Sequence, residues 1–337
     1  MARRPSAPSG VRGARRGTVS RARPGGASRS TEKRRGEHMN EALRAALADV
    51  VAIPVTPFAA DGTVDEPAQR ALLRLLVDSG VTTLTPNGNT GEFYALTPGE
   101  RRRAVEVTVE EAAGAATVVA GVGHEVPAAV AAARHAAAAG ARLVMIHQPV
   151  HPYVSHAGWV DYHRAVADAV PELGVVPYVR DPLLPGAVLA ELGRHCPNVT
   201  GVKYAVPDAV TFAAFARDAG LDRFVWVAGL AELYAPSYWA AGATGFTSGL
   251  VNVAPAIPLA LRDALRAGRY ADAMELWERV RPFEELRARD RSADNVSVVK
   301  EALAALGRCR REVRPPGRVL PEDRRARVAA LVRSWDA

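Results

Sequence analysis

The chain has 337 residues, 48% of them hydrophobic, and its 43 Lys and Arg against 36 Asp and Glu give a formal net charge of +7. This hydrophobic fraction excludes a chain that is disordered throughout, and the lack of any uninterrupted apolar run of about 18 residues excludes a membrane-spanning helix and a membrane partner. Two cysteines, Cys196 and Cys309, are too few for a disulfide framework and have no metal-ligand spacing, so we expect ordinary thiols, no metal site and a cytoplasmic location.

The excess positive charge lies in the N-terminal segment. Residues 1–38 contain eleven Lys and Arg and two Glu, a local charge of +9, so the remaining chain carries −2. The segment is rich in Gly, Pro and Ser and nearly free of large apolar side chains, which predicts a disordered basic tail. Three explanations stay open for it: a start codon upstream of a native start at Met39, an arm that binds nucleic acid, or a transit peptide.

From residue 46 onward, short apolar runs alternate with longer amphipathic stretches. The apolar runs, predicted as strands, are 50–55, 81–85, 117–120, 142–146, 174–178, 199–203, 224–228 and 244–247. The stretches with apolar residues at three- and four-residue spacing, predicted as helices, are 65–79, 97–113, 126–139, 157–170, 184–195, 208–219, 231–241 and 255–267.

Eight βα units favour an α/β fold of the (β/α)8 TIM-barrel type with extra C-terminal helices. A doubly wound open sheet is the alternative, but no GxGxxG motif follows a predicted strand. We expect residues 39–270 to form the barrel and residues 271–337 to form a C-terminal helical extension.

A glycine-flanked polar turn, Gly88-Asn89-Thr90-Gly91, follows the second predicted strand. In a barrel, the loops that follow the strands converge on one mouth, so functional residues belong at the carboxyl ends of strands. The glycines allow a tight turn whose N–H groups, with the Asn89 amide and the Thr90 hydroxyl beside them, face an anion such as a carboxylate. We therefore predict that Gly88 and Asn89 bind the substrate and that Thr90 is one of the catalytic residues, with an ordinary polar turn as the alternative.

The sixth predicted strand ends in Lys203. Outside the tail the chain has only one other lysine, Lys300, although arginine is abundant. A lysine amine can lose its proton and attack a carbonyl to form a Schiff base, whereas a guanidinium stays charged and is a poor nucleophile. Lys203 is therefore a candidate catalytic nucleophile, and the alternative is a lysine that extends from the barrel rim into solvent.

Side chains after the fifth and eighth predicted strands add to the candidate site. Tyr178 lies one strand from Lys203, where its hydroxyl could shuttle a proton between the amine and the substrate. Arg180 could bind a second carboxylate or orient the loop. Ser248 directly follows the eighth strand and is a further candidate for substrate binding.

The fourth predicted strand runs into a loop that contains His147, His151 and Tyr153. Two histidines four residues apart in a loop do not share a helix face, and no third ligand accompanies them, so the spacing does not favour zinc. We expect His147 and Tyr153 to hydrogen-bond to the substrate or to the loop.

In this order and spacing, the motifs resemble those of the pyruvate-type class I aldolase superfamily, which includes dihydrodipicolinate synthase, N-acetylneuraminate lyase and 5-dehydro-4-deoxyglucarate dehydratase. The resemblance covers residues 48–320 and lies in Val55-Thr56-Pro57-Phe58, Asp61-Gly62, Asn89-Thr90-Gly91-Glu92, Tyr178, Gly201-Val202-Lys203 and Asn252-Val253-Ala254-Pro255. It implies that Lys203 is the Schiff-base lysine, that Tyr178 is the proton shuttle, and that Asn89 and Thr90 bind the substrate's 1-carboxylate. It also implies a homo-oligomer, either a tetramer or a dimer.

Local segments resemble the dehydratase branch of this superfamily. Residues 90–96 look like its TGEFFSL motif and residues 178–181 look like its YNRD motif, although Val179 replaces the asparagine. Asn89 stands where the synthase typically has the first of two paired threonines and where the dehydratase usually has glycine. The resemblance therefore implies a dehydratase that acts on a 2-oxo acid derived from a sugar acid.

Two alternatives to this function remain. One is an aldolase or synthase that uses pyruvate, because the same lysine serves both reactions. The other is a non-catalytic, ligand-sensing barrel with a nucleic-acid-binding tail, although we do not expect nucleic acid as a partner. We expect no cofactor for the enzyme, because the lysine itself supplies the electron sink.

Overall fold

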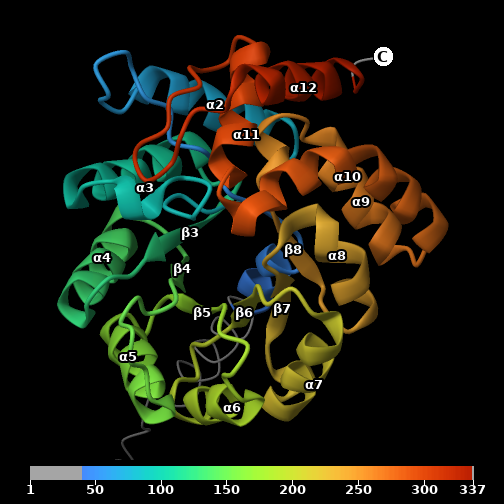
Figure 1. The fold of residues 1–337 in the computed structure, drawn as a ribbon. Coiled ribbons are helices and arrows are strands. Elements are labelled where there is room, and N and C mark those ends of the chain that lie inside the picture. Colours follow the sequence, from blue (N-terminus) through green and yellow to red (C-terminus); the bar gives the residue numbers. More distant parts are fainter. Residues whose placement is uncertain (1–39, 336–337) are drawn as a thin grey trace, which may run out of the picture. The chain divides into compact units, whose positions relative to one another are not determined.

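The computed structural model describes residues 40–335 and closes eight parallel strands into a barrel (Figure 1). The strands are β1 Val50–Ala52, β2 Thr83–Leu84, β3 Thr117–Val122, β4 Leu143–Ile146, β5 Gly174–Val179, β6 Gly201–Tyr204, β7 Val225–Ala228 and β8 Gly245–Ser248. Each strand pairs with the next one in the chain, and β8 pairs with β1. The predicted TIM barrel is thereby confirmed, whereas the predicted basic tail lies outside the described residues.

A helix follows each strand and covers the outside of the barrel. These helices are α2 Glu66–Asp78, α3 Pro98–Ala112, α4 Val126–Ala139, α5 His156–Ala169, α6 Gly186–His195, α7 Ala209–Ala219, α8 Ala231–Ala240 and α9 Ala256–Arg266. Local signals explain their ends. Thr97 and Glu100 form the capping box that starts α3, and Gly140 ends α4 with a left-handed φ of 104°.

Within the described residues, three helices follow α9: α10 Tyr270–Ser292, α11 Asn295–Ala305 and α12 Glu322–Arg333. Helix α10 packs against α8 and α9, and α11 packs against α10 and α12 (Figure 1). The last turn of α10 leaves helical geometry at residues 289–291. This departure matters for the site, because the last turn of α10 and the start of α11 reach the carboxyl ends of the strands.

The interior of the barrel is apolar at the amino ends of the strands. Residues 40–47 are helical and place Leu43 and Leu47 beneath the barrel, an element that the sequence pattern did not predict. The cluster that these leucines join also contains Val51, Val119, Leu143, Met145, Val176, Val225 and Val227. This packing leaves the carboxyl ends of the strands as the end where polar side chains gather.

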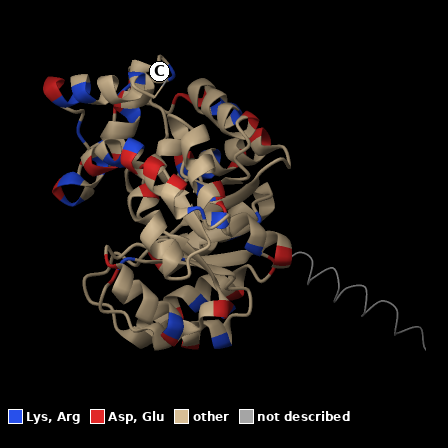
Figure 2. Ribbon diagram, turned by 90° about the vertical axis from the view of Figure 1, so that its right-hand side faces the viewer, with Lys and Arg blue, Asp and Glu red and all other residues tan. Residues whose placement is uncertain are grey.

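Charged residues of the described part lie mostly on the helices, whereas the strands are almost free of them (Figure 2). Helices α2 and α3, for example, are joined by ion pairs between Arg70 and Glu110 and between Arg103 and Glu66. No helix among residues 40–335 is both long and apolar enough to cross a membrane. Lys203 is an exception to the rule that charged residues lie outside the strands, because it lies within β6.

Candidate active site

Lys203 and Tyr178 lie side by side at the carboxyl end of the barrel. They are direct partners in the parallel pairing of β6 with β5. The Nζ atom of Lys203 lies 4.1 Å from the centre of the Tyr178 ring, and both side chains are buried. The structure thus brings together an amine and a phenol that are 25 residues apart in the sequence.

The surroundings of Lys203 favour its neutral form. Burial lowers the pKa of Lys203 to about 7, and the positive charge of Arg180 contributes in the same direction. A neutral amine has a free electron pair and can attack a carbonyl carbon. Burial also raises the pKa of Tyr178, although Arg180 and Asn89 oppose the shift, so the phenol keeps its proton at neutral pH.

Both side chains open into a cavity of about 460 Å³ at the mouth of the barrel. Five residues predicted from the sequence lie in its wall: Asn89, Thr90, Tyr178, Arg180 and Lys203. The wall also contains Gly229, Thr247 and Gly249 at the ends of β7 and β8, and Glu284, Arg287, Arg291 and Asn295 from α10 and α11. A cavity of this volume accommodates a small organic acid.

The turn after β2 is held in one conformation. Its backbone closes through hydrogen bonds from the Gly91 N–H to the Gly88 carbonyl and from the Glu92 N–H to the Asn89 carbonyl, both 3.0 Å long. A side chain at Gly88 would place Cβ 2.4 Å from Cγ2 of Ile53, so only glycine fits there. Gly88 therefore shapes the turn, and Asn89 and Thr90 reach the cavity.

Hydrogen bonds connect this turn to Tyr178 and to the C-terminal helices. Asn89 Nδ2 donates to the Tyr178 hydroxyl at 3.4 Å, while the buried Asn89 Oδ1 has no partner among residues 40–335. Thr90 Oγ1 donates to Asn295 Oδ1 at 3.4 Å, and Arg287 Nη2 donates to the same oxygen at 3.3 Å. The turn after β2 and Tyr178 are therefore parts of one polar network.

The second lysine, Lys300, supports the turn from outside the cavity wall. Its buried Nζ lies 2.5 Å from Glu92 Oε1 and donates to the Glu312 carbonyl at 2.8 Å. The other Glu92 oxygen accepts a 2.8 Å hydrogen bond from the Arg314 backbone N–H. This ion pair ties the turn to α11, a role that the sequence signalled only through the scarcity of lysine.

Four predicted substrate-binding residues, Gly88, His147, Tyr153 and Ser248, do not lie in the wall of the 460 Å³ cavity. His147 is buried, stacks on Phe93 at 4.0 Å and bonds through Nε2 to the Asn87 carbonyl at 2.8 Å. Burial lowers the pKa of His147 to about 3, so Nε2 carries the proton of a neutral ring and donates. Tyr153 is 85% exposed in the loop after β4.

Ser248 belongs to a buried polar cluster behind the cavity. Its Oγ donates to Glu232 and accepts from the Val251 N–H at 2.9 Å, so it has no hydrogen bond left to donate. Burial and the neighbouring Glu284 raise the pKa of Glu232 to about 8. Glu284 in turn binds Arg287 through both oxygens, at 2.7 and 2.9 Å. Sequence reasoning missed Glu232, Glu284 and Arg287, because helical residues carry no local sign of such a cluster.

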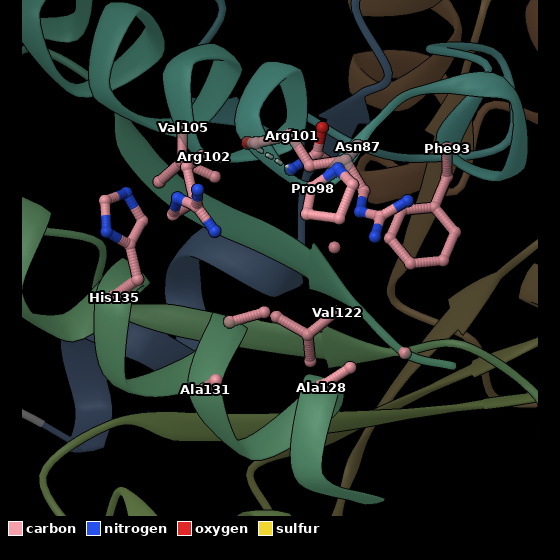
Figure 3. A pocket seen from close by; sticks show the side chains of 13 residues that line it. Asn87, Phe93, Pro98, Arg101, Arg102, Val105, Val122, Ala128, Ala131 and His135 are labelled. Atoms are coloured by element: carbon pink, nitrogen blue, oxygen red, sulfur yellow. Dashed lines mark hydrogen bonds between the residues drawn. The ribbon is translucent and has the colours of Figure 1, made fainter. Parts of the chain in front are cut away.

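A separate cavity of about 250 Å³ lies between α3 and α4 (Figure 3). Arg101 and Phe93 lie along one side of it and Ala131 and His135 along the other. The Arg101 guanidinium lies 5.1 Å from the centre of the Phe93 ring. Lys203 is not in its wall, so the cavity at the barrel mouth is the candidate active site.

Comparisons with known proteins agree with this geometry. The model of the dihydrodipicolinate synthetase family matches residues 46–334. A probable 5-dehydro-4-deoxyglucarate dehydratase of Methylobacterium radiotolerans is 36% identical over 297 residues, which are 87% of this chain and 96% of the relative. One of Saccharopolyspora erythraea is 33% identical over 302 residues, 88% of this chain and 97% of the relative.

Solved structures with the same fold include two dihydrodipicolinate synthases. The enzyme from Bacillus clausii has a TM-score of 0.84 and 38% identity, with 88% of this chain and 100% of that chain covered. The enzyme from Oceanobacillus iheyensis has a TM-score of 0.84 and 36% identity, with 88% and 99% covered.

Proposed function

The chain belongs to the dihydrodipicolinate synthetase family, and from this membership we propose that it is a dehydratase-like lyase that binds a 2-oxo acid as a Schiff base on Lys203. The observation that carries the proposal is the buried Lys203 amine, 4.1 Å from the Tyr178 ring, in a cavity that also contains Asn89, Thr90 and Arg180. An amine with a pKa of about 7 is neutral in about half of the molecules at neutral pH.

The first stage of the proposed reaction is formation of the imine. Nζ of Lys203 attacks C2 of the 2-oxo acid, and the resulting carbinolamine loses its hydroxyl as water to leave a cationic imine. The Tyr178 hydroxyl donates the proton that the departing hydroxyl needs and later takes it back. The substrate's 1-carboxylate binds to the turn at Asn89 and Thr90.

The second stage is elimination from the imine. Its positive nitrogen withdraws electrons, so C3 loses a proton and an enamine forms. The electron pair of the enamine expels the hydroxyl at C4, which takes up a proton and leaves as water. One water then hydrolyses the imine and restores the Lys203 amine, so the net change in the substrate is the loss of one water.

The dehydratase outcome is supported by the curated relatives, which are named probable 5-dehydro-4-deoxyglucarate dehydratases. Their named substrate is a sugar-derived acid with two carboxylates. Arg180 lines the cavity and forms no ion pair with any described residue, so it is available for the second carboxylate. Asn89 does not separate the two outcomes, because the synthase typically has threonine at this position and the dehydratase usually has glycine.

A turnover assay tests the proposed function. We expect the enzyme to eliminate water from 5-dehydro-4-deoxyglucarate. NMR of the substrate and product measures this reaction. Pyruvate with an aldehyde partner serves as the control for the aldolase or synthase reaction. Condensation of pyruvate without elimination from the sugar acid would favour that alternative, and the lack of an adduct with any 2-oxo acid would reject Schiff-base chemistry.

The pKa of Lys203 predicts the pH dependence of adduct formation. The pKa is lowered to about 7, so the amine becomes neutral at a pH where an ordinary lysine is still charged. We expect the initial rate of adduct formation with pyruvate to rise between about pH 6 and pH 8 and then to level off. Borohydride quenching and mass spectrometry measure this rate. In Arg180→Gln the midpoint should move to higher pH, because one charge that lowers the pKa is gone; an unchanged midpoint contradicts the explanation.

Other expectations belong to the same proposal. A homo-oligomer, either a dimer or a tetramer, and a cytoplasmic location are part of it. So are the division of the chain into a tail at 1–38, a barrel at 39–270 and a C-terminal helical extension at 271–337. Light scattering on the purified chain measures the oligomeric state.

A further inference from the structure

The cavity that contains Lys203 has more positive charge in its wall than negative charge. Its wall has three arginines, Arg180, Arg287 and Arg291, together with Lys203, and a single carboxylate, Glu284. Arg287 holds that carboxylate through two hydrogen bonds. Among the described residues, neither Arg180 nor Arg291 has a side-chain ion pair, so the wall holds two arginines that a ligand can neutralise.

The lack of an acidic partner for Arg291 does not come from a lack of acids nearby. Asp290 lies next to it in the chain but pairs with Arg289 at 3.8 Å and with Arg324 at 4.0 Å. Asp294 also pairs with Arg324. The local carboxylates therefore face arginines outside the cavity wall.

The backbone explains how Arg291 enters the wall. Asp290, Arg291 and Ser292 have φ values of 51°, 59° and 66°, three successive left-handed residues that are not glycine. Such conformations cost on the order of 1 kcal/mol or more each. This reversal ends α10 and places Arg291 and Ser292 in the cavity wall, while Arg289 and Asp290 stay outside it.

Arg180 and Arg291, which we call the mouth arginines, are both exposed side chains of the cavity wall. Arg180 directly follows β5, and Arg291 lies in the last, non-helical turn of α10. We propose that the two mouth arginines together bind the distal carboxylate of a 2-oxo dicarboxylic acid whose carbonyl reacts with Lys203. Guanidinium groups bind carboxylates through paired, charge-assisted hydrogen bonds, which gives both affinity and direction.

This inference rests on the proposed function, because it assumes an imine on Lys203 and the 1-carboxylate at the turn after β2. It adds a residue from the C-terminal helices, Arg291, as a determinant of substrate choice. Binding at the mouth would align the dicarboxylic acid along the cavity, from the turn to the mouth arginines.

Two 2-oxo acids of equal length test the inference. 2-Oxoadipate has six carbons and a distal carboxylate, and 2-oxohexanoate has the same carbon chain without that carboxylate. We expect the wild-type protein to form half-maximal borohydride-trapped adduct at a roughly tenfold lower concentration of 2-oxoadipate. Arg291→Gln should remove most of this preference and leave the trapping of 2-oxohexanoate unchanged, whereas Arg291→Lys should keep part of it.

Arg289→Gln is the matched control, because Arg289 lies in the same segment but outside the cavity wall. It should keep the preference of the wild type within about twofold. A wild-type preference that survives in Arg291→Gln overturns the inference. Equal loss of both adducts in Arg291→Gln also overturns it, because Arg291 would then support the site as a whole.

The same experiment separates this inference from the proposed function. Adducts with both acids and no preference in the wild type would leave the Schiff-base chemistry standing and reject the distal-carboxylate site. No adduct with either acid or with pyruvate would reject the proposed function itself.

Discussion

Replacement of Lys203 by arginine is expected to abolish both turnover and the borohydride-trapped adduct, a loss on the order of 10⁴-fold or more. Arginine keeps the positive charge but cannot form an imine, because its guanidinium does not lose its proton at neutral pH. Mass mapping of the trapped wild-type protein should place the adduct on the peptide that contains Lys203.

Lys300 serves as the internal control for that experiment. Both lysines are buried, but Lys300 forms an ion pair with Glu92, whereas Lys203 has no carboxylate partner among the described residues and opens into the cavity. The adduct should therefore be absent from the peptide with Lys300. An adduct on that peptide, or one that persists in Lys203→Arg, would show that another group carries the chemistry. Lys203→Met removes the amine and its charge without adding the larger guanidinium. It therefore shows whether the loss of activity in Lys203→Arg comes from the missing nucleophile or from the size of arginine.

The barrel could be predicted from the sequence because each βα unit carries its own local signals. Apolar runs and amphipathic periodicity mark the elements, and glycines such as Gly80 and Gly220 adopt the left-handed φ that ends a helix. The helix at residues 40–47 was not predicted, because its short pattern gives no sign that Leu47 packs beneath the barrel. The residues against which Leu47 packs are distant in the sequence.

The inner half of the site could be predicted for a topological reason. Parallel strands in a barrel end at the same mouth, so Tyr178 and Lys203, at the ends of neighbouring strands, were expected to meet. Arg287, Arg291 and Asn295 lie more than 80 residues further along the chain, on helices. Their position depends on how α10 packs against α8 and α9, which is a tertiary property without a local signature.

His147 shows the limit of the same rule. It follows β4 at the correct end of the barrel, but its ring stacks on Phe93 and bonds to the Asn87 carbonyl instead of reaching the cavity wall. Position at a strand end therefore predicts which residues lie near the mouth, whereas the direction of each side chain is decided by packing.

Removal of one oxygen in Tyr178→Phe is expected to lower kcat by about 10²–10⁴-fold, the range typical of a lost general acid or base. The ring is buried and lies 4.1 Å from Lys203 Nζ, so phenylalanine keeps the packing and the contact with the amine. The one protein hydrogen bond lost is the 3.4 Å bond from Asn89, which is long and therefore weak. We expect KM to change much less than kcat, because the carboxylate contacts remain.

Tyr162→Phe is the matched control for this prediction. The Tyr162 hydroxyl donates to the His124 carbonyl at 2.8 Å and lies outside the cavity wall, so its loss should lower the free energy of unfolding by about 1 kcal/mol without a change in kcat. The rate of imine trapping adds a second measurement for Tyr178→Phe. A phenol that moves protons in imine formation predicts slower trapping with pyruvate, where no elimination follows. A kcat near that of the wild type, or a loss matched by a fall in stability alone, would show that Tyr178 only packs against Lys203.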